Sequence, residues 1–431
     1  MKKATELLHQ ANQVLDFKEV VACVDSFLKR ADAFVESVQK HGSPLYVFDE
    51  KAFSEGVEQF AAAFKETLGE IHIFYAVKSN NHPLLVKNSV RCGLGLDVSS
   101  GLELDLALSC NCSDIIFSGP GKTDEELQLA VRHSDKITVL IDSFGELDRL
   151  EKAASKSKTK VRAGVRLTTD DRGIWRKFGI PLSKLESFME KAISLSHVLL
   201  CGLQFHTSWN LNPGQQVAFI TLMGQSLQAL SKNCRDMIKF IDIGGGYWPP
   251  QGEWLQRAGT PKGRLQQALL NTISPTTEHY KLPSSPITTF AKKIGAAIQK
   301  HVAPYVDCCF YAEPGRWLSN DAMHILLTVV DKKSEDLVIT DGGTNIIGWE
   351  RFETDYFPVI NLSRPSRIER KCFILGSLCT PHDVWGYGYF GDGIEPGDLL
   401  LIPNQGAYTY SLRQEFIKPL PEVVELGHSR K

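Results

Sequence analysis

Short apolar runs alternate with longer amphipathic stretches through the first three quarters of the chain, and this alternation most constrains the fold. The runs are often β-branched and have the length of buried strands. They lie at residues 71–77, 94–98, 115–118, 137–141, 161–167, 199–205, 240–243 and 308–311. Between them are stretches of helical character such as 101–110, 125–134 and 181–195. Eight strands alternating with helices predict a (β/α)8 barrel rather than an open sheet.

The texture changes after residue 318. Strand-like runs separated by turn residues follow at 325–330, 337–340, 372–375 and 399–403. This pattern predicts a mostly β second domain. The expected organisation is therefore an N-terminal extension over residues 1–45 that packs on the β domain, an α/β barrel over 46–318, and a β domain over 319–431.

Charge and composition exclude several classes of protein. The net charge is −2, with 43% apolar and 23% charged residues, which is ordinary for a globular protein. Nucleic acids and membrane surfaces are therefore not expected partners, and no apolar run approaches the roughly 20 residues of a membrane helix. The N-terminal residues lack the apolar core of a secretory signal. The ten cysteines match no zinc-ligand spacing, so reduced thiols in a cytoplasmic protein without a metal are expected.

Residues with useful chemistry stand at the ends of five predicted strands, and a barrel of this kind places its active site there. In chain order they are Lys78, Asp97, His206, the glycines Gly244, Gly245 and Gly246, Glu313 and Arg316. Taken singly, each could be a solvated or structural residue or an ordinary turn. Together they suit a cofactor that carries an aldehyde and a phosphate. A desolvated lysine binds the aldehyde, glycine N–H groups and an arginine bind the phosphate, and a carboxylate keeps the ring nitrogen protonated.

These motifs resemble those of the fold-type III pyridoxal-phosphate (PLP) decarboxylases, the family of diaminopimelate, ornithine and arginine decarboxylases. The resemblance spans residues 43–421 or so. It is carried by YAVKSN, the strand-end histidine, KFG at 177–179, DIGGG, EPGR, GSLCTPHD and GAYTYS. A barrel of the alanine-racemase type with a β domain is the fold that it implies.

The resemblance also implies roles for the cofactor-binding residues. Lys78 would bind PLP covalently, His206 would stack on its ring, and Glu313 would pair with the pyridine nitrogen. Asp97 counts among the residues around the cofactor. The residues implied for the phosphate are Gly244, Gly245, Gly246, Arg316 and Tyr408.

A cysteine loop in the β domain completes the implied site. Cys379 would come from the partner subunit of a homodimer and return a proton to the substrate after CO2 departs. Asp383 would lie in the same loop, near the substrate. The two active sites of the dimer would thus be shared between subunits.

Three departures from the family pattern bear on the substrate. Relatives that act on diamino acids usually carry an acidic residue after the loop cysteine, where this chain has Thr380, whose hydroxyl cannot pair with an ammonium as a carboxylate does. Trp209 replaces a small residue shortly after His206. The segment after DGGTN offers Arg351 and Arg364, either of which could meet a substrate carboxylate or be a surface group. The expected substrate contacts are Cys379, Thr380, Asp383 and Arg351.

These departures favour a larger or more acidic amino-acid conjugate, of the kind decarboxylated in carboxylate-siderophore assembly. meso-Diaminopimelate of lysine biosynthesis stays open as an alternative substrate. Racemisation on the same scaffold is a second alternative, although Glu313 and Cys379 favour decarboxylation. An inactive regulatory homologue is a third, and the presence of both Lys78 and Cys379 argues against it.

Overall fold

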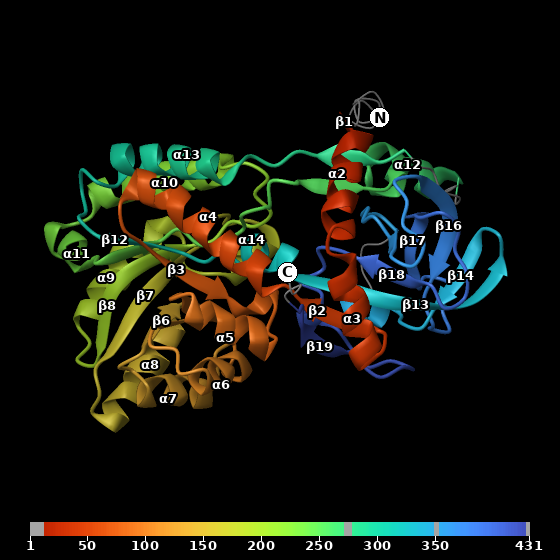
Figure 1. The fold of residues 1–431 in the computed structure, drawn as a ribbon. Coiled ribbons are helices and arrows are strands. Elements are labelled where there is room, and N and C mark those ends of the chain that lie inside the picture. The colour runs from red at the N-terminus through yellow and green to blue at the C-terminus, as the bar shows by residue number, and fades with distance from the viewer. Residues whose placement is uncertain (1–12, 271–277, 349–352, 428–431) are drawn as a thin grey trace. The chain divides into compact units, whose positions relative to one another are not determined.

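The computed structural model describes residues 13–270, 278–348 and 353–427, and the chain divides into two compact units (Figure 1). One unit comprises residues 54–250 and 285–318. The other comprises the chain up to residue 53 together with 251–284 and 319–431. Residues 46–53 and 251–284, which the sequence assigned to the barrel, cluster with the β domain. The reason for the first is that strand β2 (Leu45–Phe48) pairs with strands of the β domain.

The first unit is a closed barrel of eight parallel strands, which confirms the predicted fold class. Neighbouring strands pair in chain order, and the last strand pairs with the first and so closes the barrel. The strands are β3 (Ile71–Ala76), β4 (Gly95–Val98), β5 (Ile115–Phe117), β6 (Ile137–Ile141), β7 (Val161–Leu167), β8 (Val198–Phe205), β9 (Phe240–Asp242) and β12 (Cys309–Ala312). Each lies within two residues of a predicted run.

Helices alternate with these strands, and several begin at a capping residue that the sequence supplies. Ser100, Thr123 and Ser143 each accept a hydrogen bond from the backbone of the first turn, which satisfies a donor without an intrahelical partner. The helices are α4 (Glu50–Leu68), α5 (Pro83–Arg91), α6 (Gly101–Ser109), α7 (Asp124–Arg132), α8 (Phe144–Ser157), α9 (Leu185–Ile193), α10 (Gly214–Ala229), α11 (Lys232–Met237), α13 (Ile287–His301) and α14 (Arg316–Ser319).

Apolar side chains fill the inside of the barrel below the C-terminal ends of its strands. Phe74, Ile116, Leu140 and Phe240 form a buried cluster, and Tyr311 stacks on Phe240 with ring centroids 4.6 Å apart. Because side chains alternate along a strand, the next inward positions toward the C-terminal ends lie one layer above these rings. Polar residues occupy that layer.

The second unit contains an eight-stranded sheet in the order β14-β16-β17-β15-β18-β13-β2-β19 and a small sheet in the order β1-β11-β10. The further strands are β1 (Gln13–Val14), β10 (Glu253–Leu255), β11 (Tyr280–Leu282), β13 (Met323–Ser334), β14 (Leu337–Thr340), β15 (Ile360–Asn361), β16 (Glu369–Leu375), β17 (Val384–Phe390), β18 (Leu399–Ile402) and β19 (Glu422–Glu425). Its helices are α2 (Phe17–Leu28), α3 (Ala31–His41) and α12 (Pro261–Leu270).

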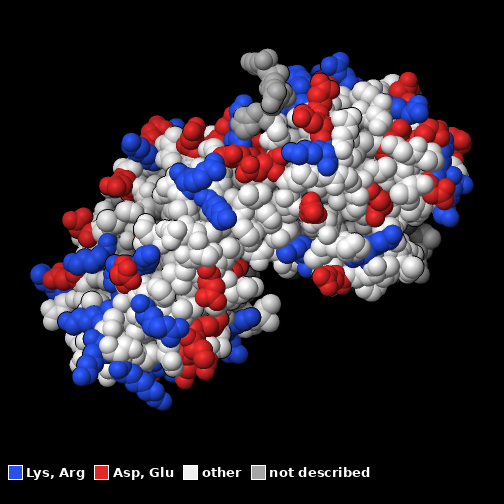
Figure 2. Space-filling view, turned by 60° about the horizontal axis from the view of Figure 1, so that its bottom comes forward, with Lys and Arg blue, Asp and Glu red and all other residues white. Residues whose placement is uncertain are grey.

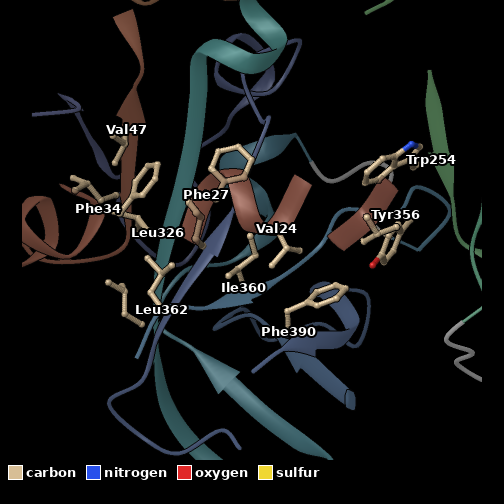
Figure 3. Packing of buried hydrophobic residues seen from close by; sticks show 14 of the residues in the cluster. Val24, Phe27, Phe34, Val47, Trp254, Leu326, Tyr356, Ile360, Leu362 and Phe390 are labelled. Atoms are coloured by element: carbon tan, nitrogen blue, oxygen red, sulfur yellow. The ribbon is translucent and has the colours of Figure 1, made fainter. Parts of the chain in front are cut away.

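The N-terminal helices supply part of this unit's core. Val24 and Phe27 of α2 and Phe34 of α3 pack with sheet residues such as Leu326 and Ile360 (Figure 3). These side chains are at most 5% exposed. Burial of such aliphatic and aromatic groups stabilises a fold by roughly 1.5–3 kcal/mol each. Helices α2 and α3 are therefore integral to the β unit.

The surface carries both signs of charge. On the face that Figure 2 shows, Lys and Arg side chains are interspersed with Asp and Glu. Among the described residues, no helix combines the length and the apolar character that crossing a bilayer requires.

Candidate active site

Lys78 follows β3 in a single turn of 3-10 helix (Val77–Ser79) at the C-terminal end of the barrel. Its Nζ donates to Oδ2 of Asp97, at 2.6 Å, and the Asp97 side chain is fully buried. The other oxygen, Oδ1, accepts from the hydroxyl of Ser118 at 2.6 Å. Asp97 therefore has both oxygens engaged and holds the amine at one place in the mouth of the barrel.

Glu313 follows β12, and its side chain is 1% exposed. Its Oε1 accepts from Nε2 of Gln204 at 3.1 Å. Burial acts to raise the pKa of Glu313, but the charge of Lys78 and the adjacent Asp242 carboxyl act in the opposite direction, and the net effect is a lowered pKa. The site thus maintains an anion at this buried position.

His206 follows β8 and is held in one orientation. Its Nδ1 lies 3.1 Å from the N–H of Gly245 and 3.5 Å from Oε2 of Glu313. Nδ1 cannot both accept a hydrogen bond from the N–H of Gly245 and donate one to Glu313. The shorter contact makes Nδ1 the acceptor, so the proton of the neutral ring is on Nε2. Burial lowers the pKa of His206, which agrees with a neutral imidazole.

The three glycines after β9 pack against backbone on both sides. Gly244 and Gly246 have φ angles of +68° and +83°, which L side chains rarely adopt. A Cβ at Gly244, Gly245 or Gly246 would lie 2.1–2.3 Å from the carbonyl oxygen of Phe205, Glu313 or Thr207 respectively. A glycine turn of this kind allows a phosphate to approach the backbone N–H groups. Arg316, at the start of α14, lies with its guanidinium 4.3 Å from the ring centre of Trp248.

All the barrel residues that the sequence singled out therefore converge on one end of the barrel. The set fits PLP: an amine oriented by a buried carboxylate, a buried anion at Glu313, and a glycine turn that any Cβ would fill. Sequence reasoning missed Gln204, Ser118 and Asp242. The available signal was their position, because each is a polar residue at an inward-facing end of an apolar strand.

The cysteine loop lies in the β unit, between β16 and β17. Cys379 is exposed and Thr380 half-buried. Asp383 is buried, and its two oxygens accept from the backbone N–H groups of Thr344 at 2.6 Å and Leu378 at 2.7 Å. Within this unit the Asp383 carboxylate thus organises the loop that presents Cys379.

Three further residues that the sequence offers as candidates for binding the cofactor or the substrate fall within the sequence range of the β unit. Tyr408 follows β18 with a φ of +60°, a left-handed conformation that is uncommon for a residue with a side chain. Arg364 pairs through Nε with Asp398 at 3.2 Å, so its charge is engaged on the sheet. Arg351 lies outside the described residues.

A cavity of about 1320 Å³ lies beside the ends of β7 and β8. Its walls include Asp170, Arg172, Trp175, Trp209, Phe219 and Leu222. Trp209 is 67% exposed and has a φ of +55°. A large aromatic side chain in a left-handed backbone conformation, only three residues after His206, is an outlier of the kind that concentrates at binding sites.

Comparisons with known proteins show what the chain is similar to. Residues 54–320 match the family model described as "Pyridoxal-dependent decarboxylase, pyridoxal binding domain". The chain is 26% identical to the L-glutamyl-[BtrI acyl-carrier protein] decarboxylase of Niallia circulans, over 89% of this chain and 88% of that protein. It is also 26% identical to the diaminopimelate decarboxylase of Aquifex aeolicus, over 95% and 91% of the two chains.

Solved structures show the same fold. Diaminopimelate decarboxylase from Helicobacter pylori, in complex with L-lysine, superposes with a TM-score of 0.74 at 21% identity, over 91% of this chain and 94% of the other. The lysine/ornithine decarboxylase from Vibrio vulnificus, complexed with putrescine, gives a TM-score of 0.71 at 20% identity, over 92% and 98%.

Proposed function

The chain belongs to the family of pyridoxal-dependent decarboxylases and is a PLP-dependent amino-acid carboxy-lyase, and we propose that its substrate is an amino acid carried within a larger conjugate. The observation that carries this proposal is the cavity beside β7 and β8, which has two tryptophans in its walls. A free diamino acid is small and polar, so its binding does not require a cavity of this size with tryptophans in its walls. Thr380 supports the proposal, because a hydroxyl cannot replace the carboxylate that would recognise a distal ammonium.

Two kinds of conjugate are to be distinguished. One relative is named for a glutamyl group attached to an acyl-carrier protein. The other kind is a citrate-type conjugate, as in carboxylate-siderophore assembly. Free meso-diaminopimelate is the second candidate substrate, because several relatives at 23–26% identity are named for it.

Bound PLP supplies an electron sink for the pair released when the bond between the α-carbon and the carboxylate breaks. Lys78, oriented by Asp97, is placed to hold the cofactor aldehyde. Glu313 would pair with the ring nitrogen of the bound cofactor, and neutral His206 would stack on its ring. The residues assigned to the phosphate are Gly244, Gly245, Gly246, Arg316 and Tyr408.

We assign the final protonation of the α-carbon to the Cys379 thiol. In this proposal the protein is a homodimer, and each Cys379 serves the barrel of the partner subunit. Exposure of Cys379 within its own β unit is consistent with such a role. Asp383 contributes by fixing the loop, through its hydrogen bonds to backbone N–H groups.

The cofactor assignment is tested with Lys78→Ala. The variant is expected to lose both the visible absorbance of lysine-bound PLP and all measurable CO2 release. Lys87→Ala, an exposed lysine on α5, is the matched control and should keep both. Turnover by Lys78→Ala at a near-normal rate would remove Lys78 from its assigned role.

The substrate assignment is tested by CO2 release from meso-diaminopimelate, citrate-conjugated diamino acids and a glutamyl-carrier-protein conjugate, assayed in parallel. Release from a conjugate alone is the expected result. Trp209→Ala should then lower kcat/KM for that conjugate, because it removes an apolar wall of the cavity. Efficient release from free diaminopimelate, with no effect of Trp209→Ala, would place the enzyme with its diaminopimelate-specific relatives instead.

A further inference from the structure

Asp242, the last residue of β9, lies in the polar layer directly above the aromatic rings of the barrel interior. It pairs in register with Tyr311 of β12 and Gln204 of β8. Phe240, two residues before Asp242, stacks on Tyr311, two residues before Glu313. Because side chains two apart on a strand face the same side, Asp242 and Glu313 both project into the barrel. Asp242 is fully buried.

The hydrogen bonds of these two acids are complementary. Oδ1 of Asp242 accepts from the N–H of Gly244 at 2.8 Å. Its Oδ2 is buried and accepts no hydrogen bond from an N–H or O–H donor among the described residues. Glu313, beyond the end of the neighbouring strand and facing the same interior, accepts from Gln204. A hydrogen bond between two carboxyl groups requires a proton on one of them, because two adjacent buried anions repel.

The surroundings decide which acid carries that proton. Burial, the charge of Glu313 and the hydrogen bond to Glu313 raise the pKa of Asp242 well above its ordinary value. Glu313 and Asp97, both acids, act to raise the pKa of Asp242. Glu313, by contrast, is close enough to Lys78 for that charge to lower its pKa. Oδ2 of Asp242 receives no donor among the described residues, whereas Glu313 accepts from Gln204. The proton therefore belongs to Asp242 and the negative charge to Glu313.

We propose that Asp242 is a positioning acid that remains protonated at neutral pH and donates its O–H to Glu313. This inference rests on the proposed role of Glu313 at the cofactor nitrogen. Together with the Gln204 amide, the Asp242 hydroxyl fixes the orientation of the Glu313 carboxylate. It also withdraws part of the charge of Glu313, and so sets how firmly Glu313 holds the proton on the ring nitrogen.

The first test uses the apo protein and needs no activity. Asp242→Asn has the same shape and can keep both contacts, with its oxygen accepting from Gly244 and its amide donating to Glu313. Wild-type protein takes up a proton at Asp242 on folding, so its stability relative to the Asn variant is lost as pH rises above the unfolded aspartate pKa of about 3.9. We expect the ratio of the two unfolding constants to change by about tenfold per pH unit between pH 5 and 7. A ratio independent of pH would show that Asp242 is ionised and would overturn the proposal.

The second test uses the PLP-loaded enzyme and Asp242→Leu, which can neither donate nor accept. We expect kcat to fall at least tenfold with little change in KM, and the pH at which the visible spectrum of bound PLP titrates to shift. Asp242→Asn should restore most of the kcat and the wild-type spectral titration. Equal loss in both variants, with an unshifted spectrum, would reduce Asp242 to a packing residue.

The two tests separate this inference from the proposed function. If no substrate releases CO2, the proposed function fails, while the apo unfolding ratio and the spectral titration of bound PLP still report the protonation of Asp242. If CO2 is released but the unfolding ratio is flat, only the inference about Asp242 fails.

Discussion

Replacing Gly246 by alanine tests how closely the glycine turn is packed against the loop that follows β8. The new Cβ would lie 2.1 Å from the carbonyl oxygen of Thr207 and 2.8 Å from Nδ2 of Asn210. The backbones must separate by about an ångström to reach an ordinary contact. Overpacking of this kind costs about 1–3 kcal/mol, and a residue with a Cβ at a φ of +83° adds about 1–2 kcal/mol.

The expected destabilisation of the barrel is therefore about 2–5 kcal/mol, which corresponds to a fall in Tm of roughly 5–15 °C for a unit of this size. Gly93→Ala is the matched control. Gly93 also has a positive φ, +79°, but a Cβ there meets nothing within 4 Å. The control should lose only the backbone part, about 1–2 kcal/mol.

Thermal and urea unfolding of the apo proteins, followed by circular dichroism, measure both variants. Gly246→Ala should also bind PLP more weakly, because the turn that carries the phosphate-facing N–H groups must shift. Equal losses of stability in Gly246→Ala and Gly93→Ala would refute the reasoning, since the steric contribution would then be negligible. Unchanged PLP affinity would separate the turn from the phosphate.

Two further predictions concern the shared site and a buried ion pair. Cys379→Ala should keep PLP but slow turnover or deliver the proton to the wrong atom. Mixing it with the inactive Lys78→Ala variant should restore about a quarter of the wild-type activity, through the one intact site of each mixed dimer. No recovery after confirmed subunit exchange would argue against shared sites. The ammonium group of Lys122 donates to the carboxylate of Glu146 and to the carbonyl oxygens of Gly119 and Leu140, each at 2.7 Å. The side chains of Lys122 and Glu146 are each 1% exposed. Lys122→Met should cost about 3–5 kcal/mol of unfolding free energy in urea, and adding Glu146→Gln should recover part of it. Burial raises the pKa of Glu146, and Lys122 opposes the rise. Lys122→Met alone should therefore lose more stability as pH increases, because the buried Glu146 then ionises without its partner. A stability difference from wild type that does not depend on pH would contradict this.

The barrel was predictable because its determinants are local and repeated. A buried parallel strand is a short apolar run, and a strand-end position follows from counting along that run. This is why Lys78, His206 and the three glycines could be assigned to one end of the barrel before any coordinates. The β domain was predicted less completely from the sequence. Strand β17 was missed, because two glycines interrupt residues 384–390 and the buried and half-buried side chains there give no clear alternation.

The partners of each polar group were decided only by the tertiary structure. Asp242 reads in the sequence as part of a glycine motif, yet closure of the barrel brings it beside Glu313, some 70 residues away in the chain, and makes its proton part of the site. Asp383 reads as a substrate residue, and the fold gives both of its oxygens to backbone N–H groups of its own unit. The sequence by itself determined which strands form and which residues stand at their ends, because periodicity and residue type are local properties. Hydrogen bonds and charge depend on what is buried beside each group, and that is fixed only when distant strands close into a barrel or a sheet.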